Sequence, residues 1–240
     1  MTATEIIWHD IECGAYREDL PLWRSLAREH GGPILEVGAG TGRVSVDLAR
    51  LGYEVTALER DGELLAELAA RAAATALETV LADARSFTLE RRFSLCLVPM
   101  QAIQLLGGVE ERAAFLRCAR ACLLPGGVLA TALAEVVDAY EVREGGPAPL
   151  PDIRELDGVV YASRPVAVRE QNDVFVIERM REIVAADGAH AVEENRIALH
   201  RVGADELERE GAAAGFRTLA RAHIPATLEY VGSEVVVLGA

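Results

Sequence analysis

The chain has 240 residues, of which 51% are hydrophobic, and a formal net charge of −14. This length and apolar content predict one domain, or one domain with an elaboration, that buries a substantial core. The acidic balance argues against a nucleic-acid partner, because such a surface needs basic residues to neutralise phosphate. The sequence has no apolar stretch approaching a membrane span and no secretory leader, so we expect a cytoplasmic protein without a membrane partner.

The four cysteines are scattered along the chain, and they are Cys13, Cys96, Cys118 and Cys122. Cys118 and Cys122 fall one helical turn apart, but no histidine or second cysteine pair completes a metal site. We therefore predict reduced, mostly buried thiols and no bound metal.

Residues 4–30 read as one or two amphipathic helices. Pro21 is expected to open the second helix, with Asp19 near its N-cap. A Gly-Gly-Pro sequence at 31–33 then ends the helical region before the first strand.

A glycine-rich turn at residues 38–42 joins an apolar run at 34–37 to apolar residues at helical spacing at 44–49. This pattern predicts a buried parallel strand, a tight turn and a helix. Glycines let the backbone pass directly from strand to helix and let a ligand approach it closely. Taken alone, such glycines also fit a purely structural turn.

The spacing of Gly38, Gly40 and Gly42 helps to distinguish between ligands. The third glycine comes one residue earlier than in the dinucleotide pattern G-x-G-x-x-G. Glu36 lies inside the strand, where its charge would oppose a pyrophosphate but favour an ammonium group. Glu59 ends the next apolar strand, where a carboxylate can accept hydrogen bonds from both ribose hydroxyls.

The run E-V-G-A-G-T-G at residues 36–42 resembles the first motif of class I S-adenosylmethionine-dependent methyltransferases. In that family the loop carries the methionine end of the cofactor, and the product is S-adenosylhomocysteine. The resemblance implies that Asp83, at the tip of a third strand at 80–84, accepts a hydrogen bond from the adenine amino group. The cofactor-binding residues that it implies are Tyr16, Glu36, Gly38, Ala39, Gly40, Gly42, Arg43, Glu59, Arg60, Asp83, Ala84, Arg85, Val98 and Met100.

The next elements follow the same family pattern. Residues 62–75 read as a crossover helix, 93–99 as a fourth strand and 109–122 as another helix. Ser94 stands where the family usually has an acid that serves local structure, so its absence leaves the cofactor prediction in place. Met100 and Gln101 follow the fourth strand at its carboxyl end, where ligands bind in such sheets, so we expect them to line the acceptor site or cover the cofactor.

Residues 123–130 resemble the family's turn into a fifth strand. Residues 136–202 are predicted as an antiparallel insertion after this strand, because three stretches with strand alternation are joined by Asn-Asp and Asp-Gly turns. This arrangement resembles the addition in small-molecule methyltransferases, including N-methyltransferases of nucleotide-linked aminosugars. There it shapes the acceptor pocket or a homodimer contact. Residues 203–215 read as the last helix, capped near Asp205, and 216–225 and 233–238 read as the last two strands.

The expected fold is α/β. It comprises a seven-stranded, mostly parallel, doubly wound sheet with helices on both faces, a reversed last strand and the antiparallel insertion. The cofactor domain would comprise residues 31–135 and 203–240. Residues 1–30 correspond to the helical lid of the family.

The resemblance implies methyl transfer from S-adenosylmethionine to a nitrogen or oxygen atom of a small molecule. The sulfonium carbon is already electrophilic, so the reaction mainly needs alignment, and a neutral amine acceptor needs no base. We assign no catalytic base among the titratable candidates, which are His9, His200, His223, Glu135 and Glu229. The expected acceptor contacts are Trp8, Gln101, Gln104 and Glu135.

Two other functions remain open. A nicotinamide-dependent oxidoreductase predicts G-x-G-x-x-G and no adenine acid, and the sequence fits neither expectation. An S-adenosylmethionine-binding protein without catalysis is compatible with the lack of an assigned base, as is an amine acceptor. No Asn-Pro-Pro-Tyr or Asp-Pro-Pro-Tyr run follows strand four, so methylation of a nucleic-acid base is not expected. The sequence determines neither the acceptor nor the oligomeric state.

Overall fold

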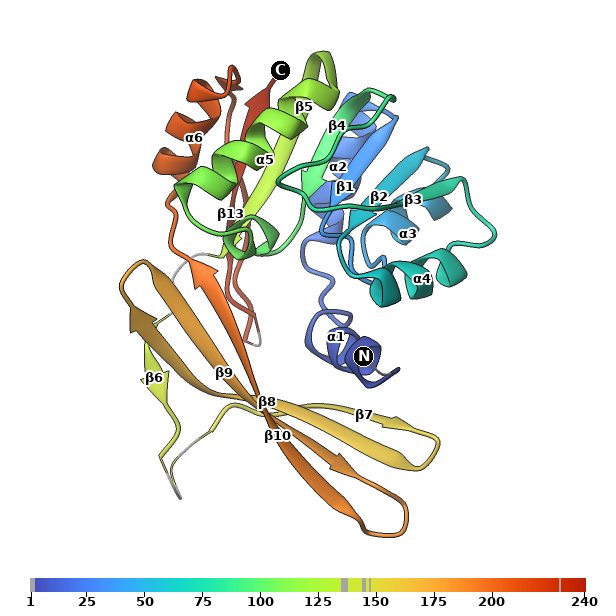
Figure 1. Ribbon diagram of the computed structural model, residues 1–240, viewed down its shortest axis with the longest axis vertical. Coiled ribbons are helices and arrows are strands. Elements are labelled where there is room, and N and C mark those ends of the chain that lie inside the picture. Colours follow the sequence, from blue (N-terminus) through green and yellow to red (C-terminus); the bar gives the residue numbers. More distant parts are fainter. Residues whose placement is uncertain (1–2, 135–137, 144–145, 147, 229) are drawn as a thin grey trace. The chain divides into compact units, whose positions relative to one another are not determined.

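The computed structural model describes residues 3–134, 138–143, 146, 148–228 and 230–240. The chain divides into two compact units, both drawn in Figure 1. The core unit comprises residues 16–136 and 202–240, and the insertion unit comprises residues 1–15 and 137–201. The N-terminal region predicted as one lid is thus divided between the two units, and its role as a lid stays a prediction.

The core unit is built on one sheet. Its strands are β1 (Ile34–Val37), β2 (Val55–Glu59), β3 (Leu77–Leu81), β4 (Phe93–Val98), β5 (Leu123–Ala134), β11 (Arg217–Thr218), β12 (Ala222–Ile224) and β13 (Ser233–Gly239). They follow the spatial order β11-β13-β5-β4-β1-β2-β3, and β12 pairs with β13. Strands β1 to β5 pair in parallel, whereas β13 runs antiparallel to β5. The predicted mostly parallel sheet with a reversed last strand is confirmed.

Helices cover both faces of this sheet (Figure 1). They are α2 (Leu20–His30), α3 (Ser45–Arg50), α4 (Gly62–Arg71), α5 (Val109–Cys122) and α6 (Ala204–Ala213), with a short 3₁₀ helix η1 (Ala102–Leu105) after β4. Because side chains alternate along a strand, Leu35 and Val37 of β1 join a buried cluster with α5 and α6, while Ile34 joins one with α2 and α3. Within the described ranges, no helix is both long enough and apolar enough to cross a membrane.

Three details of the core unit differ from the sequence prediction. The third strand covers Leu77–Leu81 and not 80–84, so Asp83 lies beyond its end. The strand predicted over 216–225 is broken into β11 and β12. Gly203, and not a residue near Asp205, occupies the N-cap of α6.

The insertion unit combines one helix with an antiparallel sheet. Its elements are α1 (Ala3–Glu12), β6 (Tyr140–Glu141), β7 (Asp152–Leu156), β8 (Val159–Gln171), β9 (Val174–Val184) and β10 (His190–His200). The strand order is β10-β9-β8-β6, with β7 paired to β8, and every pair is antiparallel. The three long strands were predicted, whereas β6 and β7 were not.

A buried charge cluster fixes α1 to this sheet. Glu12 accepts hydrogen bonds from Arg181 Nε (2.8 Å), Arg181 Nη2 (3.0 Å) and Ser163 Oγ (2.7 Å). Trp8 is fully buried, with its ring centre 5.3 Å from the Arg181 guanidinium and 5.5 Å from the ring centre of Tyr161. Helix α1 is therefore part of the fold of the insertion unit.

Ser163→Ala is expected to lower the free energy of unfolding by about 1–2 kcal/mol, because the buried Glu12 carboxylate loses a donor. Ser163 is fully buried and also accepts a hydrogen bond from Arg179 Nη1 (3.2 Å). Ser94→Ala is the matched control, since the bond from Ser94 Oγ to Gly32 O is exposed and its loss should cost less than about 0.5 kcal/mol. Urea denaturation measures both variants, and equal losses would contradict the anchoring role of Ser163.

Candidate functional site

The turn after β1 has the backbone conformation that its glycines predict. Gly38, Gly40 and Gly42 have φ angles of +72°, +55° and +93°, a region that is open to glycine and costly for other residues. The amides of Gly38 and Ala39 donate to Leu58 O at 2.9 and 3.2 Å. The turn is therefore folded across the carboxyl ends of β1 and β2, where doubly wound sheets bind their ligands.

Gly42→Ala is expected to lower the free energy of unfolding by about 2–4 kcal/mol. A Cβ at Gly42 would lie 2.8 Å from Leu68 Cγ and 2.8 Å from Val46 Cγ2, at a φ of +93°. Gly52 is a matched control, because its φ is +91° and a Cβ there would meet no described atom within 4 Å. Gly52→Ala should cost only backbone strain, about 1 kcal/mol, in thermal denaturation. Equal losses would show that packing beneath the turn is not tight.

Glu59 ties the end of β2 to this turn. Its Oε2 accepts a hydrogen bond from the amide of Gly40 (2.9 Å), and its Oε1 accepts from the amides of Arg60 (2.8 Å) and Asp61 (3.0 Å). The residue is only 8% exposed. A carboxylate has about four lone-pair positions, so Glu59 is held in place and can still accept from a ligand hydroxyl.

Glu36 is a buried acid in the interior strand β1, and it is 2% exposed. Its Oε2 has no hydrogen-bond partner among the described residues. Burial raises the pKa of Glu36 to about 7, and Ser45 and the Arg43 guanidinium offset only part of this effect. An unsatisfied buried acceptor is costly in a folded protein, so this oxygen is a candidate partner for a ligand donor.

Arg43 follows the glycine turn, and its guanidinium forms an ion pair with Asp19. The Nη1 and Nη2 atoms of Arg43 donate to Asp19 Oδ1 (2.5 Å) and Oδ2 (2.7 Å), and Nη1 also donates to Tyr16 O (3.1 Å). Asp19 accepts a further bond from Trp23 Nε1 (2.7 Å). Asp19 occupies the N-cap position of α2, as predicted, but its side chain does not cap the helix. The pair instead joins the start of α2 to the glycine turn.

Asp83 and Arg85 lie beyond the end of β3 and bind each other. Asp83 Oδ1 accepts from Arg85 N (2.8 Å) and Nε (2.9 Å), and Oδ2 accepts from Nη2 (2.5 Å). Hydrogen bonds from Arg85 lower the pKa of Asp83 to about 2, so the carboxylate is ionised at neutral pH. Its side chain is 34% exposed, so a ligand can reach it.

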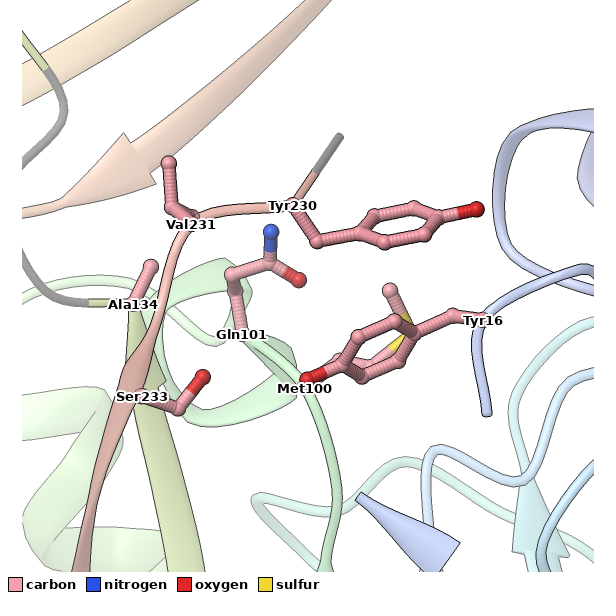
Figure 2. Close-up of a pocket in the computed structure, with 7 residues that line it drawn as sticks. All are labelled: Tyr16, Met100, Gln101, Ala134, Tyr230, Val231 and Ser233. Atoms are coloured by element: carbon pink, nitrogen blue, oxygen red, sulfur yellow. The ribbon is translucent and has the colours of Figure 1, made fainter. Parts of the chain in front are cut away.

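A small cavity of about 60 Å³ follows β4. Met100 lines it with a φ of +53°, which is uncommon for a residue with a side chain and typical of functional sites. Tyr16 and Gln101 also line it, together with residues that the sequence analysis did not select, namely Ala134, Tyr230, Val231 and Ser233. Figure 2 shows the rings of Tyr16 and Tyr230 projecting toward each other from opposite sides, with ring centres 4.9 Å apart.

The predicted acceptor contacts have different surroundings in the structure. Gln101 lines the cavity, whereas Gln104 is buried and its Oε1 accepts from the last amide of β5 (2.9 Å). Trp8 is fully buried within the insertion unit, and its contact with an acceptor stays a prediction. Glu135 and Glu229 lie outside the described residues.

The other predicted cofactor residues differ in exposure. Val98 is fully buried at the end of β4, Ala84 is buried beside Asp83, and Arg60 is exposed after β2. Their contacts with a ligand stay predictions.

A family model of a methyltransferase domain matches residues 34–127. The match contains β1, the glycine turn and the acids at the ends of β2 and β3. Residues 34–127 are therefore similar to a methyltransferase domain. The match supports methyl transfer over the nicotinamide-dependent alternative.

Solved methyltransferases share the fold of the whole chain. The sugar N-methyltransferase KedS8 from Streptoalloteichus sp ATCC 53650 is 21% identical and aligns over 98% of this chain and 92% of its own, with a TM-score of 0.73. CalS10, an amino pentose methyltransferase from Micromonospora echinaspora solved with S-adenosylmethionine bound, is 22% identical over 99% and 97% of the two chains, with a TM-score of 0.69. The similarity extends beyond the methyltransferase domain to the added strands.

A curated relative matches more locally. The rRNA adenine N-6-methyltransferase of Corynebacterium diphtheriae is 36% identical over 64 residues, which are 27% of this chain. The chain thus spans about a quarter (25%) of the length of this relative. The match supports the methyltransferase domain and leaves the acceptor undetermined.

Proposed function

We propose that this protein transfers a methyl group from S-adenosylmethionine to a small molecule in the cytoplasm. The observation that carries the proposal is the buried Oε2 of Glu36, which has no donor among the described residues. The ammonium group at the methionine end of the cofactor is such a donor. Glu59 and Asp83 follow at the ends of β2 and β3. The three acids therefore lie near the carboxyl ends of three neighbouring strands, β1, β2 and β3.

The residues near the carboxyl ends of these strands fit the cofactor. A Cβ at Gly38 would lie 3.1 Å from Ala102 Cβ, so glycine keeps the turn compact where a ligand would lie against the backbone. Glu59 would face the ribose hydroxyls and accept from one of them with its remaining lone pair. Asp83, which Arg85 keeps ionised, would accept from the adenine amino group.

The bound cofactor would supply an electrophilic methyl group on a sulfonium centre. The task of the protein is then to align the acceptor, and Met100 and Gln101 at the end of β4 line the cavity expected to do so. Burial raises the pKa of Tyr16 to about 12. Its phenol therefore stays protonated at neutral pH, where it is a hydrogen-bond donor for a ligand and not a base in the resting protein.

We propose an amine on a sugar-sized molecule as the acceptor, in preference to a hydroxyl. The two structurally similar proteins are described as methylating a sugar nitrogen and an amino pentose. A neutral amine needs no base, and Tyr16, Tyr230 and Ser233 offer neutral hydroxyl groups in the cavity. The net charge of −14 disfavours an RNA acceptor such as that of the rRNA enzyme.

Two experiments test this function. Equilibrium titration should show binding of S-adenosylhomocysteine and none of NAD. Transfer of a labelled methyl group should favour aminosugars over matched sugars that carry a hydroxyl in place of the amine. Cofactor binding without transfer to any acceptor would support the non-catalytic alternative, and transfer to RNA would contradict a small-molecule acceptor.

A further inference from the structure

We propose that Glu36 is a neutral acid in the empty protein and releases its proton to solvent when the cofactor's ammonium group arrives. The inference rests on the proposed function, since it concerns the same crevice. It makes cofactor binding a proton-coupled event.

The place of Glu36 in the sheet excludes water from its carboxyl group. Glu36 pairs in register with Ala57 of β2 and Leu97 of β4, both of which are fully buried and uncharged. Its side chain shares the sheet face of Ile34, which packs with α2 and α3. Glu36 is 2% exposed and its Oε2 has no partner in the described part of the chain, so an ionised Glu36 would have little solvation.

The charged groups around Glu36 do not offset the cost of burying its ionised carboxylate. Arg43 is the cation on this side, but both of its terminal nitrogens bind Asp19 at 2.5 and 2.7 Å. Asp19, at the start of α2, adds a negative charge that opposes ionisation, and the side chain and backbone of Ser45 in α3 offset only part of the effect of burial. Burial consequently raises the pKa of Glu36 to about 7.

Binding of the cofactor's ammonium group would shift Glu36 from its acid form to its carboxylate form. The ammonium group brings a full positive charge and N–H donors to Oε2, and both favour the carboxylate over the acid. The carboxyl O–H bond breaks, the proton goes to buffer, and the ion pair of Glu36 with the ammonium remains. If the pKa falls well below 6 in the complex, about 0.9 proton is released near pH 6 and about 0.1 near pH 8.

Calorimetric titration with S-adenosylhomocysteine in buffers of different ionisation enthalpy measures this proton directly. We expect release of close to one proton near pH 6 and an affinity that rises about tenfold from pH 6 to pH 8. Methylthioadenosine, which lacks the amino acid portion, should bind without proton release. Glu36→Gln should remove both the release and the pH dependence, whereas the exposed Glu67→Gln should keep them.

Infrared difference spectra give a second measurement on the unmodified protein. The carboxylic-acid carbonyl band should disappear when S-adenosylhomocysteine binds near pH 6. Binding with no proton release and no loss of this band would overturn the inference while leaving the proposed function in place. Failure of S-adenosylhomocysteine to bind at any pH would overturn the proposed function and the inference together.

Discussion

Asp19→Ala is expected to lower the free energy of unfolding by about 3–5 kcal/mol, the largest loss for a single side chain of the site. Asp19 is fully buried, and it accepts from two nitrogens of Arg43 and from Trp23 Nε1. Its removal takes the Asp19 carboxylate away from the guanidinium of Arg43, whose side chain is only 7% exposed. The indole N–H of the fully buried Trp23 also loses its acceptor.

Asp47→Ala is the matched control for this prediction. Asp47 binds Arg24 with two hydrogen bonds of 2.8 and 2.6 Å, but the Arg24 side chain is 43% exposed. An exposed pair of this geometry should be worth less than about 1 kcal/mol. Chemical denaturation of both variants gives the comparison, and similar losses would refute the structural role of the Asp19 pair.

Glu36→Gln is expected to stabilise the empty protein at alkaline pH. The pKa of Glu36 rises from 4.5, its value in a solvated chain, to about 7 in the folded state. The folded protein therefore holds this proton more tightly than the unfolded chain, and stability falls as pH rises between these two values. The penalty for wild type relative to the variant should grow by about 2–3 kcal/mol between pH 5 and pH 8.

Denaturation of wild type and Glu36→Gln across this pH range tests the sign as well as the size of the effect. Other titrating groups are common to both proteins, so the difference between the curves isolates Glu36. A constant difference from pH 5 to pH 8 would show that Glu36 is ionised throughout. The variant should also bind S-adenosylhomocysteine more weakly above pH 7, since it lacks the negative charge that would face the ammonium group.

Local sequence patterns predict the core strands well where both faces of the sheet are covered. β1, β2 and β4 are almost entirely buried and mostly apolar because helices pack on each side of them. β3 is an edge strand with an exposed Glu78, so its apolar pattern does not mark its ends and the prediction is displaced along the chain. The strand predicted over 216–225 is interrupted beside Arg221, whose side chain binds Glu208 and Glu234.

The candidate site is likewise predictable from the sequence only in part. Glu36 and Glu59 could be selected from sequence because their places depend only on the local strand, turn and helix. The raised pKa of Glu36 could not, because it depends first on burial of the carboxyl group by the packed core and only then on Ser45, Arg43 and Asp19. Tyr230 reaches the cavity from the segment before the last strand, and no motif marks it.

A crystal structure of the protein with S-adenosylhomocysteine is the most direct test of the account. We predict the ammonium group within hydrogen-bond distance of Glu36 Oε2, the ribose hydroxyls on Glu59 and the adenine amino group on Asp83. An empty crevice, or a bound ligand with the carboxylates of Glu59 and Asp83 turned away from it, would contradict the assignment.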